Sequence, residues 1–303
     1  MSNYFDNKSA FLEPTVTQYG SSMVMTNVNK PRKTKYVNID TKFTDDYSRK
    51  ANNKNDHYSV TFPERINEVR SMTVTQIEIP ITFNNVCLSL GNSNFGVQNQ
   101  TTQQDVIVSA PDGHYSGFDT PAYLQNLPSE LDFTMDANKV ITLSNLSVST
   151  SYKINFAIDG SGNFDKFSLK SKLGWLLGFR RDFYIVGPNE RIVAESSVDC
   201  RPVRYLYLVL DEFTNSFPNS FISFFTHSAM NKKIIAKIAL GNSSSFGTVL
   251  TGNEKNGILV SDNRLYNSKI DVQRLNIQLV NEWGKVVDLN GLDFSFLLKI
   301  EHE

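Results

Sequence analysis

The side chains that could do chemistry are few and scattered along this sequence. Its histidines are His57, His114, His227 and His302. A zinc site or a catalytic dyad needs such groups in pairs, and none of these four is paired with another histidine or a cysteine at ligand spacing. They stand at a strand start, in a turn, in an aromatic loop and at the penultimate position, so we expect surface or turn roles for them.

Two acidic doublets, Asp45-Asp46 and Asp211-Glu212, are the candidates for a cation site or for general acid catalysis. Both lie beside expected strand ends among threonine and asparagine, where carboxylates commonly cap turns. We therefore expect turn capping at both doublets. Cation binding near Asp45, Asp46 or Asp211 stays open as the alternative.

Motifs of nucleophile, zinc or phosphate chemistry are absent from the sequence, which contains no G-x-S-x-G, H-E-x-x-H or G-x-x-x-x-G-K-[ST]. We expect no enzymatic activity, no catalytic, cofactor-binding or metal-binding residues, and no cofactor. An aromatic cluster could stack on nucleic-acid bases, but it lacks interleaved lysine and arginine, so core filling or a subunit contact is the simpler interpretation. The cluster consists of Phe217, Phe221, Phe224 and Phe225.

Charge and composition narrow the class of protein further. The 303 residues include 30 Lys+Arg and 31 Asp+Glu, a net charge of -1 that gives no general attraction to nucleic acid or anionic membrane. With 40% hydrophobic residues, 21 Phe and 12 Tyr, the chain has enough apolar material for a folded core. No secretory signal is recognisable, and the longest apolar stretch, Tyr205 to Leu210, is too short to span a bilayer. We expect a soluble cytosolic product in which Cys87 and Cys200 are reduced thiols.

Short runs with a period of two, bounded by Asn, Asp, Gly and Pro, predict strands from Tyr36 onward. In the run from Val69 to Phe83 the apolar positions change from even to odd numbers, which predicts a bulge or two-sided burial near Thr75-Gln76. Two segments, Asp119 to Leu127 and Ser171 to Gly178, have the pattern of short helices. The other predicted strands are Tyr36 to Asp40, His57 to Phe62 ending at Pro63, Asp105 to Ala110, Lys139 to Leu143, Tyr152 to Phe156, Arg204 to Leu210, Lys233 to Leu240, Val272 to Asn281 and Phe294 to Glu301.

Eight or more strands with one or two short helices predict an all-β sandwich or barrel. Residues 1–34 have no apolar period and end in a basic, proline-interrupted stretch, so we expect a flexible N-terminal arm. Residues 35–303 are expected to form a single domain, with a loop-rich insertion at about 211–266. We expect Trp175, Leu176 and Phe179 in its core; a surface position for Trp175 at a partner contact is the alternative.

Several motifs occur in an order that goes beyond a generic sandwich. The most specific are Leu173-Gly174-Trp175-Leu176-Leu177-Gly178-Phe179 and the turn Asp112-Gly113-His114-Tyr115 before the first expected helix. They follow the strand runs from Tyr36 and His57, and precede Arg204 to Leu208 and the C-terminal Asn281-Glu282-Trp283-Gly284. In this order the chain resembles the single jelly-roll penton and minor capsid proteins of virophages and large eukaryotic double-stranded DNA viruses, over most of residues 36–300.

The resemblance implies an antiparallel single jelly roll of two four-stranded sheets, and a structural role in an icosahedral virion assembled in the host cytoplasm. The implied partners are further copies of the chain, as a homopentamer at the fivefold vertices, and the major capsid protein. No specific nucleic acid and no membrane span is expected, and no motif supports contact of the 211–266 loops with a host surface. A minor cementing protein between capsomers is the alternative, and a carbohydrate-binding jelly-roll module is the more remote one.

Overall fold

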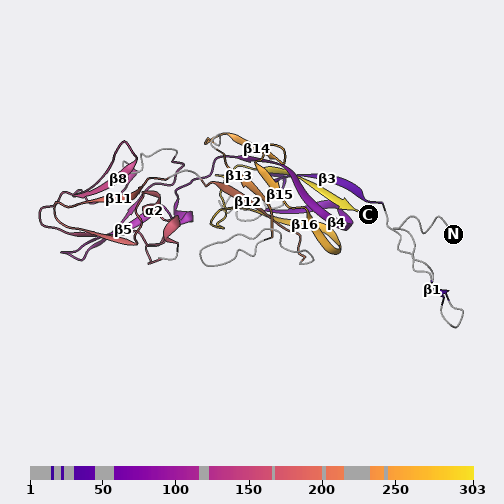
Figure 1. The fold of residues 1–303 in the computed structure, drawn as a ribbon, viewed down its shortest axis with the longest axis horizontal. Coiled ribbons are helices and arrows are strands. Elements are labelled where there is room, and N and C mark those ends of the chain that lie inside the picture. Colours follow the sequence, from indigo (N-terminus) through magenta and orange to yellow (C-terminus); the bar gives the residue numbers. More distant parts are fainter. Residues whose placement is uncertain are drawn as a thin grey trace.

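The computed structural model describes residues 31–44, 58–115, 123–165, 168–199, 203–214, 233–241 and 245–303, and the backbone of two short strands, β1 (Thr15–Val16) and β2 (Ser22–Met23). Nearly all regular structure in these residues is antiparallel β-strand, so the predicted all-β sandwich class is confirmed. Figure 1 shows the strands in two lobes that lie end to end along the long axis of the molecule.

The large lobe is one eight-stranded sheet, and its long strand β4 (Tyr58–Pro80) organises it. Residues Gln76–Glu78 of β4 pair with β17 along one edge and with β14 along the other, so these two strands flank β4. Strand β16 pairs with the first part of β4, on the β14 side, and also with β12. The other strands of this sheet are β3 (Lys33–Asp40), β12 (Tyr205–Asp211), β13 (Ile234–Ala239), β14 (Val249–Asn253), β15 (Leu259–Ser261), β16 (Arg264–Asn281) and β17 (Ser295–His302).

This sheet doubles back on itself and forms two layers of four strands. One layer runs β3–β17–β4–β14, and the other runs β16–β12–β13–β15. Strand β15, at the end of the second layer, contacts the first layer. Its Ser261 Oγ accepts a hydrogen bond from the backbone N–H of Val74 in β4, at 2.9 Å. These two layers comprise the large lobe alone, whereas the resemblance implies two four-stranded sheets over most of residues 36–300.

The core of the large lobe lies between these layers, and strict side-chain alternation fills it. In β12, Leu206, Leu208 and Leu210 point into the main core, while Tyr207 and Val209 belong to a smaller buried cluster on the other face. Burial on both faces explains why the sequence of this strand is almost continuously apolar.

Strand β4 contains the irregularity that its sequence predicts. Val74 and Gln76 pair with the consecutive residues Leu298 and Leu297, so Thr75 is the extra residue of a bulge. This bulge returns the apolar residues to the core after the change of parity, and Ile77 and Ile79 are fully buried. The predicted strand end at Pro63 is wrong, because β4 continues past it. Pro63 lies within the register shift against β16 between Thr61 and Ile66, where proline need not donate a ladder hydrogen bond.

The small lobe is a sandwich of a four-stranded and a three-stranded sheet. In its core the inner faces of both sheets pack against Leu173, the first residue of the helix α2 (Leu173–Leu176), and against Leu177 and Phe179, which follow this helix. Its strands are β5 (Asn94–Asn99), β6 (Asp105–Ser109), β9 (Tyr152–Asn155) and β10 (Phe183–Val186) in one sheet, and β7 (Leu131–Met135), β8 (Val140–Asn145) and β11 (Arg191–Ser197) in the other. Short 3-10 turns are η1 (Thr41–Phe43), η2 (Leu88–Leu90) and η4 (Leu169–Ser171).

Close packing explains both glycines of the Leu-Gly-Trp-Leu-Leu-Gly-Phe element. A Cβ on Gly174 would lie 2.2 Å from Cγ of Phe156, which stacks on Phe179. Gly178 has φ +97°, and a Cβ there would lie 2.1 Å from the backbone oxygen of Ser196 in β11. These glycines let α2 close one end of the sandwich.

The division of the chain differs from the expectation of a projecting insertion at about 211–266. The described residues of that range include β13, β14 and β15, which belong to the sheet of the large lobe. The segment that leaves this sheet and returns to it is instead about 86–199, which builds the small lobe. The prediction of a helix over 119–127 is also wrong for its described part, residues 123–127. These residues contain no α-helix, and Gln125 forms a β-bridge with Ser109.

Candidate interaction surfaces

The isolated candidates for chemistry fall into structural roles wherever the structure describes them. His114 Nδ1 lies 3.0 Å from the backbone oxygen of Phe83, and its ring packs between those of Phe83 and Phe246. His302 ends β17. Within the described residues, no three His, Cys, Asp or Glu side chains lie close enough to hold a metal ion. His57, His227, Asp45, Asp46, Cys200 and the cluster Phe217, Phe221, Phe224 and Phe225 lie outside the described residues.

The doublet Asp211-Glu212 forms ion pairs. Asp211 Oδ1 lies 2.6 Å from Lys233 Nζ, and Glu212 Oε2 lies 2.7 Å from Arg264 Nη1. The side chains of Glu212 and Arg264 are both 0% exposed, and Tyr266 donates its hydroxyl to Glu212 at 3.0 Å. Burial raises the pKa of Glu212, and the neighbouring guanidinium opposes that rise. Glu212 therefore anchors the end of β12 to β16, and Asp211 anchors it to the residue before β13.

Cys87 is a free and buried thiol, as expected for a reduced cysteine. Its Sγ lies 3.1 Å from Ser89 Oγ, in the stretch of chain that enters the small lobe.

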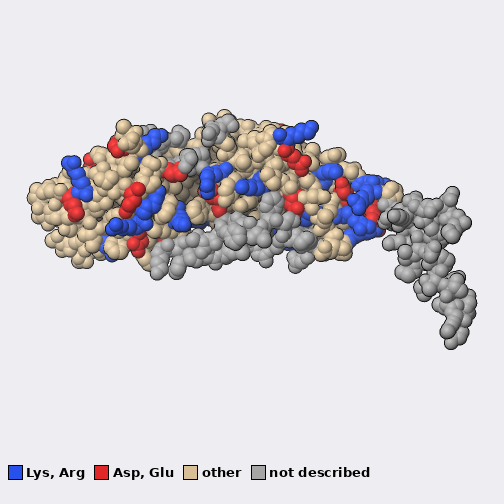
Figure 2. All heavy atoms as spheres, viewed as in Figure 1, with Lys and Arg blue, Asp and Glu red and all other residues tan. Residues whose placement is uncertain are grey.

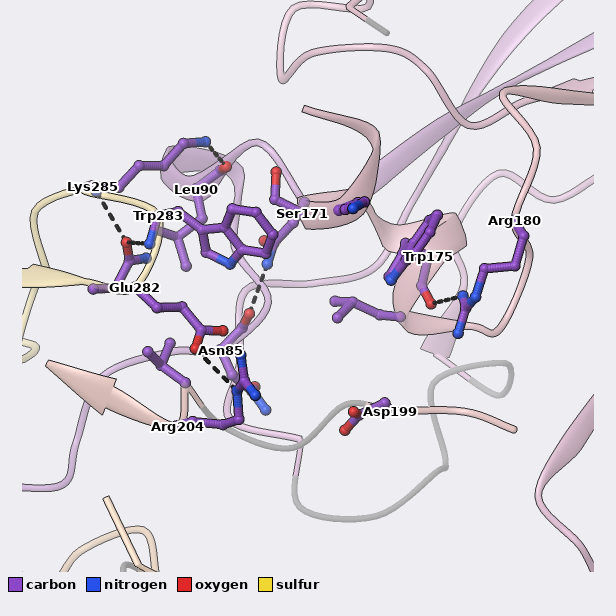
Figure 3. A pocket seen from close by; sticks show the side chains of 15 residues that line it. Asn85, Leu90, Ser171, Trp175, Arg180, Asp199, Arg204, Glu282, Trp283 and Lys285 are labelled. Carbon is purple, nitrogen blue, oxygen red and sulfur yellow. Dashed lines mark hydrogen bonds and ion pairs between the residues drawn. The ribbon is translucent and has the colours of Figure 1, made fainter. Parts of the chain in front are cut away.

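A cleft of about 330 Å³ lies where the two lobes meet. The small lobe contributes Lys170, Trp175 and Arg180 to its wall, and the large lobe contributes Arg204 and Trp283. Figure 3 shows the two tryptophan side chains on opposite sides of this space. We call this space the interlobe cleft.

Trp175 does not lie in the core, which corrects part of the expectation for the α2 element. Phe179 is 1% exposed and lies in the core, and Leu176 packs against it partly buried, but Trp175 is only half-buried and lines the cleft. The Arg180 guanidinium lies 4.3 Å from the centre of the Trp175 ring and donates to the Trp175 backbone oxygen at 2.8 Å. The side chain is thus fixed at the cleft by a cation–π contact rather than by core packing.

Trp283 is held by a tight turn at the end of β16. Asn281 Oδ1 accepts hydrogen bonds from the backbone N–H groups of Trp283 and Lys285, at 2.9 and 3.0 Å. Lys285 Nζ donates to the backbone oxygen of Leu90 in the small lobe, so this turn ties the two lobes together. Burial lowers the pKa of Lys285, and the nearby Lys172 ammonium lowers it further.

Cationic groups outnumber carboxylates in the wall of the cleft. Its four basic side chains are those of Lys170, Arg180, Arg204 and Lys285, against Asp199 and Glu282. One carboxylate is already engaged, because Glu282 Oε2 lies 3.3 Å from Arg204 Nε. The cleft therefore presents an excess of positive charge beside two indole rings.

The outer face of the β3–β17–β4–β14 layer carries mostly uncharged side chains. Cross-strand rows on this face include Asn38, Leu297 and Gln76, followed by Asn253 in β14. Charged groups of both signs gather instead at the end of the large lobe where β17 ends (Figure 2). There Arg70 and Lys269 both pair with Glu303.

The two edges of this layer are open and unlike. Among the described strands, β3 pairs only with β17 and β14 pairs only with β4. On the first edge Tyr36 is 61% exposed, and on the second Val249 is 63% exposed. An open strand edge with an exposed apolar side chain is suited to contact with another chain.

The small lobe also exposes apolar side chains, on the outer face of its four-stranded sheet. Ile107 and Phe183 lie in one cross-strand row with Gly96 and Asn155 between them, and both are exposed. At the loop that follows β8, Val148 is 80% exposed.

No protein-family model and no curated protein matches this chain. A solved structure that it resembles is the mavirus penton protein, at 10% sequence identity and a TM-score of 0.41, covering 90% of this chain and 100% of that one. A similarity of this size carries no argument about fold or function, and the fold described above rests on the chain's own strands. Of the helices in the described part, none has the length and apolar character that crossing a bilayer requires.

Proposed function

We propose that this chain is a structural subunit of an icosahedral virus particle. In this proposal it is a penton protein, which closes the fivefold vertices as a homopentamer and contacts the major capsid protein. The observation that carries the proposal is the pair of open, unlike edges β3 and β14 on one layer of the large lobe. Unlike edges favour head-to-tail contacts, which close into a ring when the rotation between neighbours allows it.

The chemistry of the large lobe supports the same role. The row Asn38, Leu297 and Gln76 on its outer layer is uncharged, so copies that meet along this row bury no charge there. The net charge of -1 gives copies little long-range repulsion.

The mass of the purified protein in solution tests the ring directly. Native mass spectrometry is expected to give five times the chain mass of 34.2 kDa, with and without reductant. Tyr36→Glu places a charge on the β3 edge, and we expect it to give monomers at concentrations where the unmodified chain is pentameric. Val148→Glu is the matched control, because Val148 is exposed on the small lobe, away from both edges. A monomeric wild-type chain, or equal loss of assembly in both variants, would count against the ring.

The position of the chain in particles separates the penton role from a minor cementing role. Fivefold averaging of particle images should place this chain at the vertices. A position only beneath or between the capsomers would replace the penton assignment with the cementing one. In the penton proposal the N-terminal arm docks on neighbouring capsid subunits or on the particle interior. Protease should therefore cut the arm between residues 14 and 34 in free subunits and leave it intact in particles.

A further inference from the structure

The interlobe cleft contains every tryptophan of the chain. The sequence has two tryptophans, Trp175 and Trp283, and both line the cleft. They come from different lobes, and each is fixed from behind, Trp175 by Arg180 and Trp283 by the turn that Asn281 caps. Arg180 covers one face of the Trp175 ring, and both indoles border a space of about 330 Å³, which is the size of a pocket for a few side chains.

The polar groups around these rings mostly donate hydrogen bonds. An indole N–H, a lysine ammonium and a guanidinium can only donate, and the cleft wall has two indoles and four cationic side chains. Of its two carboxylates, Glu282 is bound to Arg204. A ligand that combines aromatic rings with carboxylates would match both properties of this wall.

The chain itself contains a segment of that chemistry. Residues 4–13 read Tyr-Phe-Asp-Asn-Lys-Ser-Ala-Phe-Leu-Glu, with three aromatic rings and two carboxylates against one lysine. Its charge is therefore opposite to that of the cleft wall. Strand β3 starts at Lys33, and the 32 residues before it can span roughly 100 Å when extended, at about 3.3 Å per residue. An eight-residue strand such as β3 covers only about 26 Å, so the length of the arm is sufficient to reach the cleft.

We propose that the interlobe cleft binds the aromatic and acidic segment of residues 4–13 of the N-terminal arm. The tyrosine and phenylalanine rings stack against Trp175 and Trp283, and Asp6 and Glu13 pair with cationic groups of the wall such as Lys170 and Arg204. The contact closes the junction of the lobes with a segment of this chain or of another copy. This inference goes beyond the assembly role and holds whether or not the chain forms a ring.

Tryptophan fluorescence of the full chain reports on this contact alone, because both indoles are in the cleft. In an arm variant, Tyr4→Ser with Phe5→Ser and Phe11→Ser, we expect red-shifted emission and stronger iodide quenching than in the unmodified chain. A synthetic peptide of residues 2–16 should reverse both changes in the arm variant, with saturation. It should bind the unmodified chain at least about tenfold more weakly, because the arm already occupies that cleft.

Two kinds of control make the test specific. The peptide with Asp6→Asn and Glu13→Gln should bind about tenfold more weakly, and so should the unmodified peptide to an arm variant that also carries Arg204→Glu. The Arg204 side chain is 73% exposed, so we expect the fold to stay intact, which far-UV circular dichroism of the variant checks. Val148→Glu in the same background is the matched surface control and should leave peptide binding unchanged. Identical iodide quenching with and without the arm aromatics would overturn the proposal. So would the absence of saturable peptide binding.

Discussion

Gly178 provides a sharp test of how α2 is docked, through the substitution Gly178→Ala. Its backbone has φ +97°, and an added Cβ would lie 2.1 Å from the oxygen and 3.1 Å from the carbon of the Ser196 carbonyl. The clashing atoms are backbone, so a side-chain rotation cannot relieve the contact. The Ser196 N–H also donates to the Gly178 oxygen at 3.1 Å, so any shift disturbs that hydrogen bond.

The matched control is Gly291→Ala. Gly291 has φ +78°, but nothing lies within 4 Å of its added Cβ. In both variants the new alanine must adopt a left-handed backbone conformation, which costs about 1–2 kcal/mol for an L side chain. Gly178→Ala adds an overpacking cost of about 1–3 kcal/mol. We therefore expect Gly178→Ala to be less stable than Gly291→Ala by about 1–3 kcal/mol.

Thermal and urea unfolding followed by far-UV circular dichroism measure this difference. At about 2–4 °C per kcal/mol, the melting temperatures of the two variants should differ by roughly 2–12 °C. Equal melting temperatures for the two variants would refute the close approach of α2 to β11. A Gly178→Ala variant as stable as the unmodified chain would also refute the positive φ of residue 178.

Two further predictions concern carboxylates that form ion pairs. Glu212→Leu should cost about 3–5 kcal/mol of unfolding free energy, because it leaves the Arg264 guanidinium buried without its carboxylate, and adding Arg264→Met should recover most of this loss. A urea double-mutant cycle without coupling would contradict the pair. Burial raises the pKa of Asp165, but hydrogen bonds from Ser168 and Lys172 outweigh that effect and leave the pKa below its ordinary value. Its carboxylate therefore stabilises the fold above the ordinary pKa of about 3.9, and this contribution is lost as the pH falls through that value toward the lower folded-state pKa. The urea midpoint of Asp165→Asn should lie below that of the unmodified chain at pH 7 and approach it under strong acid, whereas a gap independent of pH would exclude this linkage.

Local patterns in the sequence were sufficient for the strand class and for one detailed feature of β4. Alternation and short apolar runs are properties of neighbouring residues, so β12, β17 and the second half of β16 could be predicted without knowing their partners. The parity change in β4 likewise predicts the bulge that the structure places at Thr75. Strand β5, whose sequence is Asn-Phe-Gly-Val-Gln-Asn, was not predicted, because its polar and glycine content hides the alternation.

The division into lobes and the interlobe cleft could not be read from local patterns. Both depend on which strands pair across long stretches of chain, as when β4 takes β14, β16 and β17 as neighbours. The same limit applies to Trp175, whose apolar neighbours predicted a core position. Sequence alone determined that its helix is short and bounded by glycine; the tertiary structure decided that the ring faces Trp283 across the cleft (Figure 3). Hydrophobicity specifies that a side chain avoids water, but the packing of distant segments determines which surface covers it.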